Sequence, residues 1–281
     1  MNLIDCHTHT QFSVDSDADI SEMIEKACRL GLSAYAVTDH CECNRWYSEE
    51  HYPDEDTYRY YDFGRDFENS VSAVTGLKEK YDGKLNLICG VEMGQATHDF
   101  EIAEKIVSDS RVDFVIGSMH QLPKTEDFAF IDYEKLSPQD IYGLAERYFL
   151  EINKLCKWGK FDVLGHLTYI LRYLKGSAGI DLDITPFDEI IADSFKSLVE
   201  KGKGIEINTS GLRQKYGDVL PSLKYVKLFR ELGGEALSIG SDAHTVEDLG
   251  SGISEGMEIA KAAGFEYLCY FKERKPNFIK I

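Results

Sequence analysis

Short apolar runs and longer amphipathic stretches alternate along the whole chain. Apolar residues at helical spacing predict helices over residues 20–30, 57–80, 98–108, 139–158 and 185–201, and another from Pro221 to near Gly233. Thr185 and Pro186 are typical of a capping residue and the first residue of a helix. The short runs predict buried strands over residues 2–4, 34–38, 87–91, 114–117, 161–165, 204–208 and 237–240. Strands that alternate with helices are generally parallel, so the pattern predicts an α/β fold.

Most of these predicted strands end at a side chain that can bind a metal ion. In chain order these side chains are His7 and His9, His40, Glu92, His120, His166, and Asp242 with His244. Chance would place about one of the eight histidines near a strand end, whereas six lie there. A barrel gathers all its strand ends at one face, while an open sheet binds ligands at a single crevice. We therefore predict a barrel with a metal site at that face.

The chain shows no linker, low-complexity stretch or internal repeat, so one domain over residues 1–281 is expected. The last apolar run, residues 267–271, is either an eighth strand or a segment that closes the barrel. Seven cysteines, mostly inside predicted elements, are expected to be reduced thiols. Cys41 and Cys43 lack a zinc-ribbon spacing and are not expected to bind metal.

The formal net charge of −18 argues against partners that are strongly negatively charged. Nucleic-acid-binding surfaces need basic patches, so we exclude a nucleic-acid partner. No apolar run approaches the roughly 18 residues of a membrane span, and the N-terminus has no basic patch followed by an apolar segment, as a signal peptide would. A cytoplasmic protein without a membrane partner is expected, and a homodimer is compatible with the sequence.

The ordered set of strand-end motifs resembles the polymerase and histidinol phosphatase (PHP) family. The resemblance covers essentially the whole chain and rests on Asp5-x-His7-x-His9-Thr10, Thr38-Asp39-His40, Gly90-Val91-Glu92, Ser118-Met119-His120, Gly165-His166 and Gly240-Ser241-Asp242-Ala243-His244. The stretch from Glu206 to Arg213 further resembles the histidinol-phosphate phosphatase branch. The resemblance implies a distorted (β/α)7 TIM-like barrel with a trinuclear metal site.

The resemblance also implies how the ligands are shared among two to three divalent ions of zinc, manganese or iron. The first ion would use His7, His9, Glu92 and Asp242, the second Glu92, His120 and His166, and the third Asp15, His40 and His244. Glu92 would bridge the first two ions. Position 15 is a histidine in some members, so Asp15 makes the third position favour a harder metal such as manganese.

By this resemblance the chain is expected to be a histidinol-phosphatase, a phosphoric monoester hydrolase. It would convert L-histidinol phosphate to L-histidinol and phosphate by a metal-activated hydroxide, in histidine biosynthesis. Arg172 and Arg213 follow strands whose ends face the site, and we expect them to clamp the phosphate. Asp5, Asp39 and Asp242 are candidates to orient ligands or to protonate the leaving alkoxide; Asp5 and Asp39 are expected to fix histidine tautomers.

The polar and aromatic stretch over residues 41–56 is either an active-site wall or an ordinary solvated loop. If it is a wall, its acidic and aromatic side chains would bind the ammonium and imidazole groups of histidinol by ion pairing and stacking. Trp46 is the foremost candidate, together with Glu42, Tyr47 and Asp54.

Other functions remain open at this point. Another PHP phosphoesterase, such as a protein-tyrosine phosphatase or a nucleotide phosphatase, would differ only in its pocket. A non-catalytic metal-binding module would be expected to lack some ligands, and here the set is complete. A metal-dependent amidohydrolase commonly bridges its metals with a lysine at a strand end, and this sequence has none there.

Overall fold

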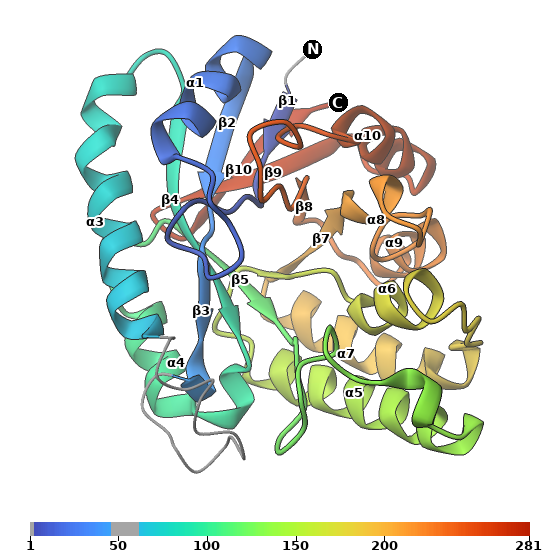
Figure 1. Cartoon of the computed structure of the whole chain (residues 1–281). Helices are drawn as coiled ribbons and strands as arrows, with labels where there is room; N and C mark the ends of the chain where they lie inside the picture. Colours follow the sequence, from blue (N-terminus) through green and yellow to red (C-terminus); the bar gives the residue numbers. More distant parts are fainter. Residues whose placement is uncertain (1–2, 46–61) are drawn as a thin grey trace.

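Parallel strands form a sheet whose first and last strands meet (Figure 1). The computed structural model describes residues 3–45 and 62–281. The barrel strands, in spatial order, are Leu3–Asp5 (β1), Leu32–Val37 (β2), Asn86–Gly94 (β4), Phe114–Ser118 (β5), Val163–Leu164 (β6), Gly204–Asn208 (β7) and Leu237–Gly240 (β8). A further strand, His40–Glu42 (β3), continues the line of β2 and pairs in parallel with the second half of β4.

Backbone hydrogen bonds between the segments that follow β1 and β8 close the barrel. Cys6 N donates to Ile239 O at 2.9 Å, and Asp242 N donates to His7 O at 2.8 Å. Every residue of β5, β7 and β8 is buried, as expected for strands that are covered on both faces. The prediction of a seven-stranded, distorted α/β barrel is confirmed.

Helices follow most of the strands and surround the sheet (Figure 1). Their bounds are Ile20–Leu30 (α1), Phe63–Tyr81 (α3), Phe100–Val107 (α4), Pro138–Trp158 (α5), Tyr169–Gly176 (α6), Asp188–Glu200 (α7), Ser210–Arg213 (α8), Leu223–Glu231 (α9) and Ile253–Ala262 (α10). The bounds of α1 are those predicted, because Asp19 caps its N-terminus and Gly31 ends it in a left-handed conformation with φ 68°. Within the described residues, no helix is both long and apolar enough to cross a membrane.

Three predicted helix starts, at residues 98, 185 and 221, are wrong. Asp99 caps the first of these helices, so α4 begins at Phe100. The Thr185 hydroxyl donates to Asp183 Oδ1 at 2.8 Å, so residues Thr185–Phe187 form a 3₁₀ turn and α7 begins only at Asp188. The chain before Pro221 is held extended because Leu220 pairs its backbone N–H and C=O with those of Asn208, both at 2.9 Å. Helix α9 therefore begins at Leu223.

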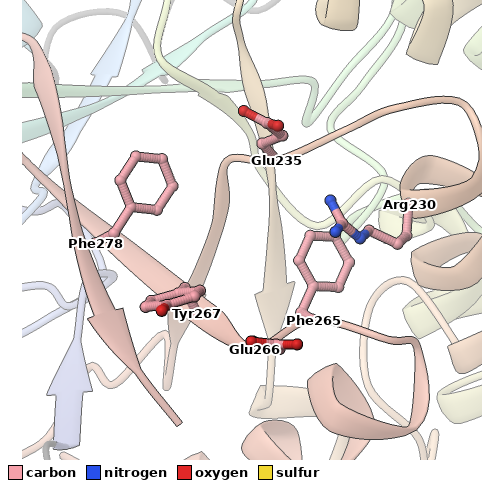
Figure 2. A pocket seen from close by; sticks show the side chains of 6 residues that line it. All are labelled: Arg230, Glu235, Phe265, Glu266, Tyr267 and Phe278. Atoms are coloured by element: carbon pink, nitrogen blue, oxygen red, sulfur yellow. The ribbon is translucent and has the colours of Figure 1, made fainter.

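The C-terminal segment forms a hairpin, and the prediction of an eighth barrel strand is wrong. Strands Tyr267–Lys272 (β9) and Lys275–Lys280 (β10) pair in an antiparallel two-stranded sheet. Phe271 stacks on Phe114, the first residue of β5, at 5.2 Å between ring centroids. The hairpin therefore covers the N-terminal end of the barrel, as the alternative prediction of a closing segment requires. Beside it lies a cavity of about 430 Å³, whose lining residues in Figure 2 are Arg230, Glu235, Phe265, Glu266, Tyr267 and Phe278.

Candidate metal centre

The C-terminal ends of the strands bring all nine predicted metal ligands into one cluster. His7, His9 and Asp15 follow β1, His40 begins β3, Glu92 lies in β4, and His120, His166, Asp242 and His244 follow β5, β6 and β8. Because parallel strands of a barrel all end at the same face, residues far apart in sequence meet there. Six of the nine are buried, while His40 and His244 are partly exposed and the Asp15 side chain is 53% exposed.

Glu92 is the centre of this cluster and is fully buried. Its Oε1 lies 3.1 Å from His120 Nε2 and 2.7 Å from His166 Nε2. Its Oε2 lies 3.3 Å from His7 Nε2, 3.5 Å from His9 Nε2 and 2.9 Å from His40 Nδ1. The two oxygens of one carboxylate thus face two different sets of histidines, which is the arrangement that a bridging ligand needs.

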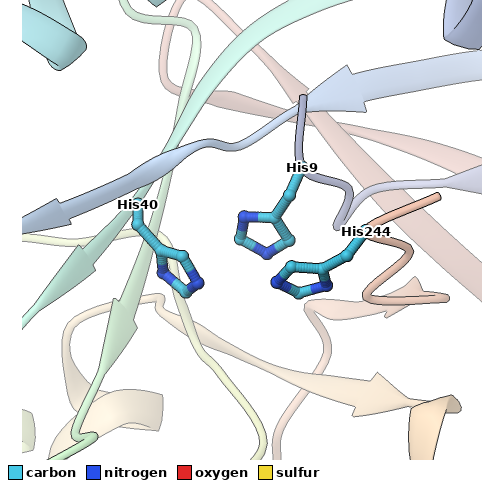
Figure 3. Close-up of side chains that lie close together, drawn as sticks. All are labelled: His9, His40 and His244. Atoms are coloured by element: carbon cyan, nitrogen blue, oxygen red, sulfur yellow. The ribbon is translucent and has the colours of Figure 1, made fainter. Parts of the chain in front are cut away.

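A second part of the cluster lies nearer to solvent. His9 stacks between His40 and His244, with ring centroids 4.2 and 4.1 Å away (Figure 3). Asp15 Oδ2 lies 3.6 Å from His40 Nε2 and 3.3 Å from His244 Nε2. Asp242 Oδ1 lies 3.3 Å from His9 Nε2 and so connects this part to the deeper one.

Several buried atoms of the cluster are left without a hydrogen-bond partner among the described residues: His7 Nε2, His9 Nε2, His40 Nδ1 and Glu92 Oε2. An unsatisfied buried polar atom costs about 1–3 kcal/mol. Four groups of three side chains have donor atoms that all lie within 4.8 Å of one another. The groups are His7, His9 and Asp242; His7, Glu92 and His166; His40, Glu92 and His120; and His9, His40 and His244. Imidazole nitrogens and carboxylate oxygens in such groups fit divalent metal ions.

The charges within the cluster shift its pKa values strongly. Burial opposes ionisation of Glu92, but His7, His120 and His40 outweigh burial and hold its pKa well below the usual range. Burial opposes the charged form of His120 too, yet Glu92 and Glu42 raise its pKa to about 10. In His9, burial and the neighbouring His244 and His40 together lower the pKa well below its usual value.

The prediction that Asp5 and Asp39 fix the histidine tautomers by direct contact is wrong. Asp5 accepts hydrogen bonds from Ser241 N at 2.8 Å and Ser241 Oγ at 2.5 Å, and among the described residues it bonds to no histidine ring. Asp39 accepts from Ser13 Oγ at 2.9 Å, and Ser13 Oγ in turn lies 3.0 Å from His9 Nδ1, so Asp39 reaches the ring only indirectly. A serine hydroxyl thus stands between that carboxylate and the histidine.

Two glutamates contact the rings directly, a role that was predicted for neither of them. Glu206 Oε1 lies 2.7 Å from His7 Nδ1, and Glu42 Oε1 lies 2.9 Å from His120 Nδ1. The sequence predicts Glu42 as a contact of the organic part of the substrate, and Glu42 both lines the smaller cavity beside the cluster and contacts the His120 ring. A signal was present in the sequence, since Glu42 lies two residues after His40 and so faces the same side of a strand.

Two cavities open on either side of the cluster. One of about 550 Å³ is lined by Asp15, Arg172, Arg213, Gln214, Asp242, His244 and Asp248. The other, of about 160 Å³, is lined by Val14, Asp15, His40, Glu42, Phe63, Gln95, His120, Asp127, Ala129, Phe130, Tyr169 and Tyr173. Asp15 lines both cavities, so the metal centre lies between them. Trp46, Tyr47 and Asp54 lie outside the described residues.

Both predicted phosphate-binding arginines line the larger cavity, and each is held firmly. Arg172 Nη2 donates to Asp242 Oδ2 at 2.7 Å and to Ser210 Oγ at 2.6 Å. Arg213 donates to the carbonyl oxygens of Ser241 at 2.6 Å and Asp242 at 2.7 Å. These bonds fix the turn in which Asp242 adopts a left-handed φ of 54°.

Known proteins resemble this chain over almost its whole length. A probable histidinol-phosphatase of Thermotoga maritima is 30% identical over 266 residues, covering 95% of this chain and 94% of that protein. A histidinol-phosphatase of Lactococcus lactis is 24% identical over 282 residues, covering 98% of this chain and 96% of that protein. The crystal structure of a histidinol phosphate phosphatase from Lactococcus lactis, complexed with zinc, L-histidinol and phosphate, superposes with a TM-score of 0.80 at 24% identity and covers 98% of this chain and 99% of that one. The model of the PHP domain matches residues 5–210. The chain therefore belongs to the PHP domain family.

Proposed function

We propose that this protein is a metal-dependent phosphomonoesterase that hydrolyses L-histidinol phosphate to L-histidinol and phosphate. The observation that carries the proposal is a centre of nine clustered metal-ligand side chains between a cavity with two arginines and a cavity with acidic and aromatic walls. Relatives that match the chain end to end bear the name histidinol-phosphatase, in agreement with this proposal.

The residues of the cluster would hold two to three divalent ions. His7, His9 and Asp242 would serve one ion, His120 and His166 a second, with Glu92 shared between them, and Asp15, His40 and His244 would serve a third. The unpartnered nitrogens of His7, His9 and His40 support these roles. Zinc suits this mixture of imidazole and carboxylate ligands, and manganese and iron are the alternatives. Bound divalent ions lower the pKa of water to about 7 and neutralise the charge of a phosphoryl group.

The larger cavity is the place for the phosphate. Burial alone would lower the pKa of the Arg172 guanidinium, but Asp242 outweighs burial and raises it, so Arg172 stays charged. The ring of Tyr169 lies 4.9 Å from its guanidinium carbon and restricts its motion. A fixed, planar guanidinium can pair with two phosphate oxygens at once, and Arg213 lines the same cavity.

The smaller cavity suits a cationic, aromatic alcohol as leaving group. Glu42 and Asp127 give it negative charge, and Tyr169, Tyr173 and Phe130 give it aromatic walls. Histidinol carries an ammonium and an imidazole group, which such a cavity binds by ion pairing and stacking. A nucleotide or a phosphotyrosine would bring an uncharged or anionic leaving group to these same carboxylates.

The carboxylates proposed as the leaving-group acid do not suit that role. Burial raises the pKa of Asp242, but Arg172 and His7 outweigh burial and hold it well below its usual range, so Asp242 is ionised. An ionised carboxylate accepts protons and binds cations, which fits a ligand. Asp5 and Asp39 are absent from the described lining of both cavities.

Steady-state kinetics test the proposal. The zinc- or manganese-loaded protein is given L-histidinol phosphate, p-nitrophenyl phosphate and a phosphotyrosine peptide. We expect kcat/KM for histidinol phosphate to exceed the others by about a thousandfold, equivalent to about 4 kcal/mol of transition-state binding. Equal, low values for the three substrates would remove the named substrate, and no turnover with metals bound would remove the enzyme function.

A further inference from the structure

Three buried polar residues in β7 and at the start of α8 belong to none of the groups of possible metal ligands among the described residues. Glu206, Asn208 and Ser210 are 1%, 0% and 0% exposed. They alternate along the chain, so Glu206 and Asn208 face the same side of β7. Buried polar side chains are costly unless they are hydrogen-bonded, so each of the three needs partners.

Glu206 joins the ring of one proposed ligand to the backbone of another. Its Oε1 lies 2.7 Å from His7 Nδ1, and its Oε2 accepts a hydrogen bond from His166 N at 3.0 Å. A hydrogen bond from Nδ1–H to a carboxylate leaves the lone pair of a neutral imidazole on Nε2. His7 Nε2 points into the cluster, 3.3 Å from Glu92 Oε2.

Asn208 and Ser210 continue the connection to the phosphate side. Asn208 Nδ2 donates to Glu206 Oε2 at 3.3 Å and to Asp242 Oδ2 at 3.2 Å. Asn208 Oδ1 accepts from Ser210 Oγ at 2.6 Å, and Ser210 Oγ accepts from Arg172 Nη2 at 2.6 Å. Asp242 Oδ2 is thereby held by Asn208 and Arg172, while its Oδ1 faces His9 Nε2.

The backbone of the neighbouring strand leaves room for this connection. A Cβ atom on Gly240 would lie 2.7 Å from Glu206 Oε1 and would collide with His7 Cβ. Only glycine therefore allows Glu206 and His7 to meet beside β8.

We propose that Glu206, Asn208 and Ser210 form a positioning network for the metal centre. Glu206 acts through His7, because its contact with Nδ1 orients the ring so that Nε2 faces the proposed metal positions. Asn208 acts through Asp242, and Ser210 acts through Arg172, so β7 and the first residue of α8 together set the geometry of both the metal side and the phosphate side. This inference rests on the proposed function, because it assumes that His7 and Asp242 are metal ligands.

The test compares zinc binding by Glu206→Gln with that of the wild type, using a chromophoric chelator as competitor. Glutamine keeps the size of the side chain but cannot accept from both His7 Nδ1 and His166 N with carboxylate strength. We expect zinc affinity to fall about 10- to 100-fold, and the visible absorption of the cobalt-loaded protein to change. Wild-type affinity with an unchanged cobalt spectrum would overturn the inference.

Asp162→Asn is the matched control, since it removes a carboxylate that is 1% exposed at the opposite end of the barrel. It should lower the unfolding midpoint and leave zinc affinity and the cobalt spectrum unchanged. Asn208→Ala tests the network from its other end: we expect about tenfold weaker zinc binding, and wild-type affinity would overturn the inference even if Glu206→Gln did not fold. A wild-type protein that binds zinc without hydrolysing histidinol phosphate would instead remove the proposed function.

Discussion

Buried carboxylates at the two ends of the barrel have different partners, as Asp113 and Asp162 at one end and Glu92 at the other illustrate. At the N-terminal end, Asp113 accepts from Lys78 Nζ at 2.5 Å and from Cys89 N at 3.0 Å. Asp162 accepts from Arg274 Nε at 2.5 Å and from Val115 N at 2.9 Å. Cations and backbone N–H groups thus satisfy both carboxylates.

At the C-terminal end, the Glu92 carboxylate faces histidines. His7, His9 and His40 each present a nitrogen to Glu92 Oε2, at 3.3, 3.5 and 2.9 Å. Asp242, in contrast, is shared between an arginine and a histidine, since its Oδ2 accepts from Arg172 Nη2 at 2.7 Å and its Oδ1 lies 3.3 Å from His9 Nε2.

Among the described residues, the ion-pair partners of Glu92 are histidines, in contrast to the lysine and arginine that pair with Asp113 and Asp162 at the other end. Histidine nitrogens gathered around one buried carboxylate form groups of donor atoms that suit divalent cations.

The largest effect is expected from Glu92→Gln. Glutamine retains the shape but loses the charge and the second anionic oxygen that face two sets of histidines. We expect kcat/KM for histidinol phosphate to fall by at least about a thousandfold, or about 4 kcal/mol, in steady-state assays with zinc. A residual activity within tenfold of wild type would contradict the central role of Glu92.

Arg274→Ala is expected to lower the stability of the protein and to leave its catalytic activity unchanged. The side chain is 23% exposed, and besides Asp162 it donates to the backbone carbonyls of Val107 and Lys160. Leaving Asp162 buried without this partner should cost about 3 kcal/mol in the free energy of urea unfolding, with kcat/KM unchanged. Lys275→Ala, at a neighbouring side chain that is 80% exposed, is the control and should change stability by less than about 0.5 kcal/mol. Equal losses in the two variants would contradict the account.

The pH dependence of zinc affinity should show whether the histidine rings of the cluster carry protons in the metal-free protein. Burial disfavours the charged form, but carboxylates outweigh burial and raise the pKa values of His7 and His40 well above the usual range and that of His120 to about 10. These rings carry protons at pH 7 without metal, and a metal must displace them. Zinc affinity should therefore rise with pH, by about tenfold per pH unit for each proton released, and level off above the raised pKa values.

Calorimetric titration in two buffers of different ionisation enthalpy measures the released protons directly. Zinc binding without proton release would mean that the rings are neutral in the metal-free protein.

The smallest effect is expected at the wall of the smaller cavity. Asp127→Asn removes a negative charge from the proposed site of the organic cation and should raise KM for histidinol phosphate about tenfold, or about 1.4 kcal/mol, but not KM for p-nitrophenyl phosphate. Glu126→Gln makes the same change of charge at an exposed neighbour outside the cavity lining and should leave both values unchanged. Equal effects on both substrates would argue against a cation-binding wall.

The sequence predicted the parts of the molecule that follow from local pattern and parallel topology. Eight of the nine proposed ligands could be found because each lies at or near the end of an apolar run, and parallel strands bring those ends together. Asp15 lies in a polar loop and was predicted from the family resemblance alone. The bounds of α1, β7 and β8 follow from caps and short apolar runs.

The remaining features depend on contacts between distant residues. Leu220 is extended only because it pairs with Asn208, and the run at 267–271 resembles a buried barrel strand although it forms a hairpin across the barrel end. Glu206 lies in the middle of a strand, so its contact with His7 appears only once β7 and β1 are placed in space.

The measurement that tests the contrast between the two barrel ends most directly is the number of zinc ions bound per chain, determined by mass spectrometry on Glu92→Gln and Arg274→Ala beside the wild type. We expect Arg274→Ala to keep the wild-type number of ions and Glu92→Gln to lose the ions that share this carboxylate. A full complement in Glu92→Gln, or an equal loss in both variants, would contradict the account.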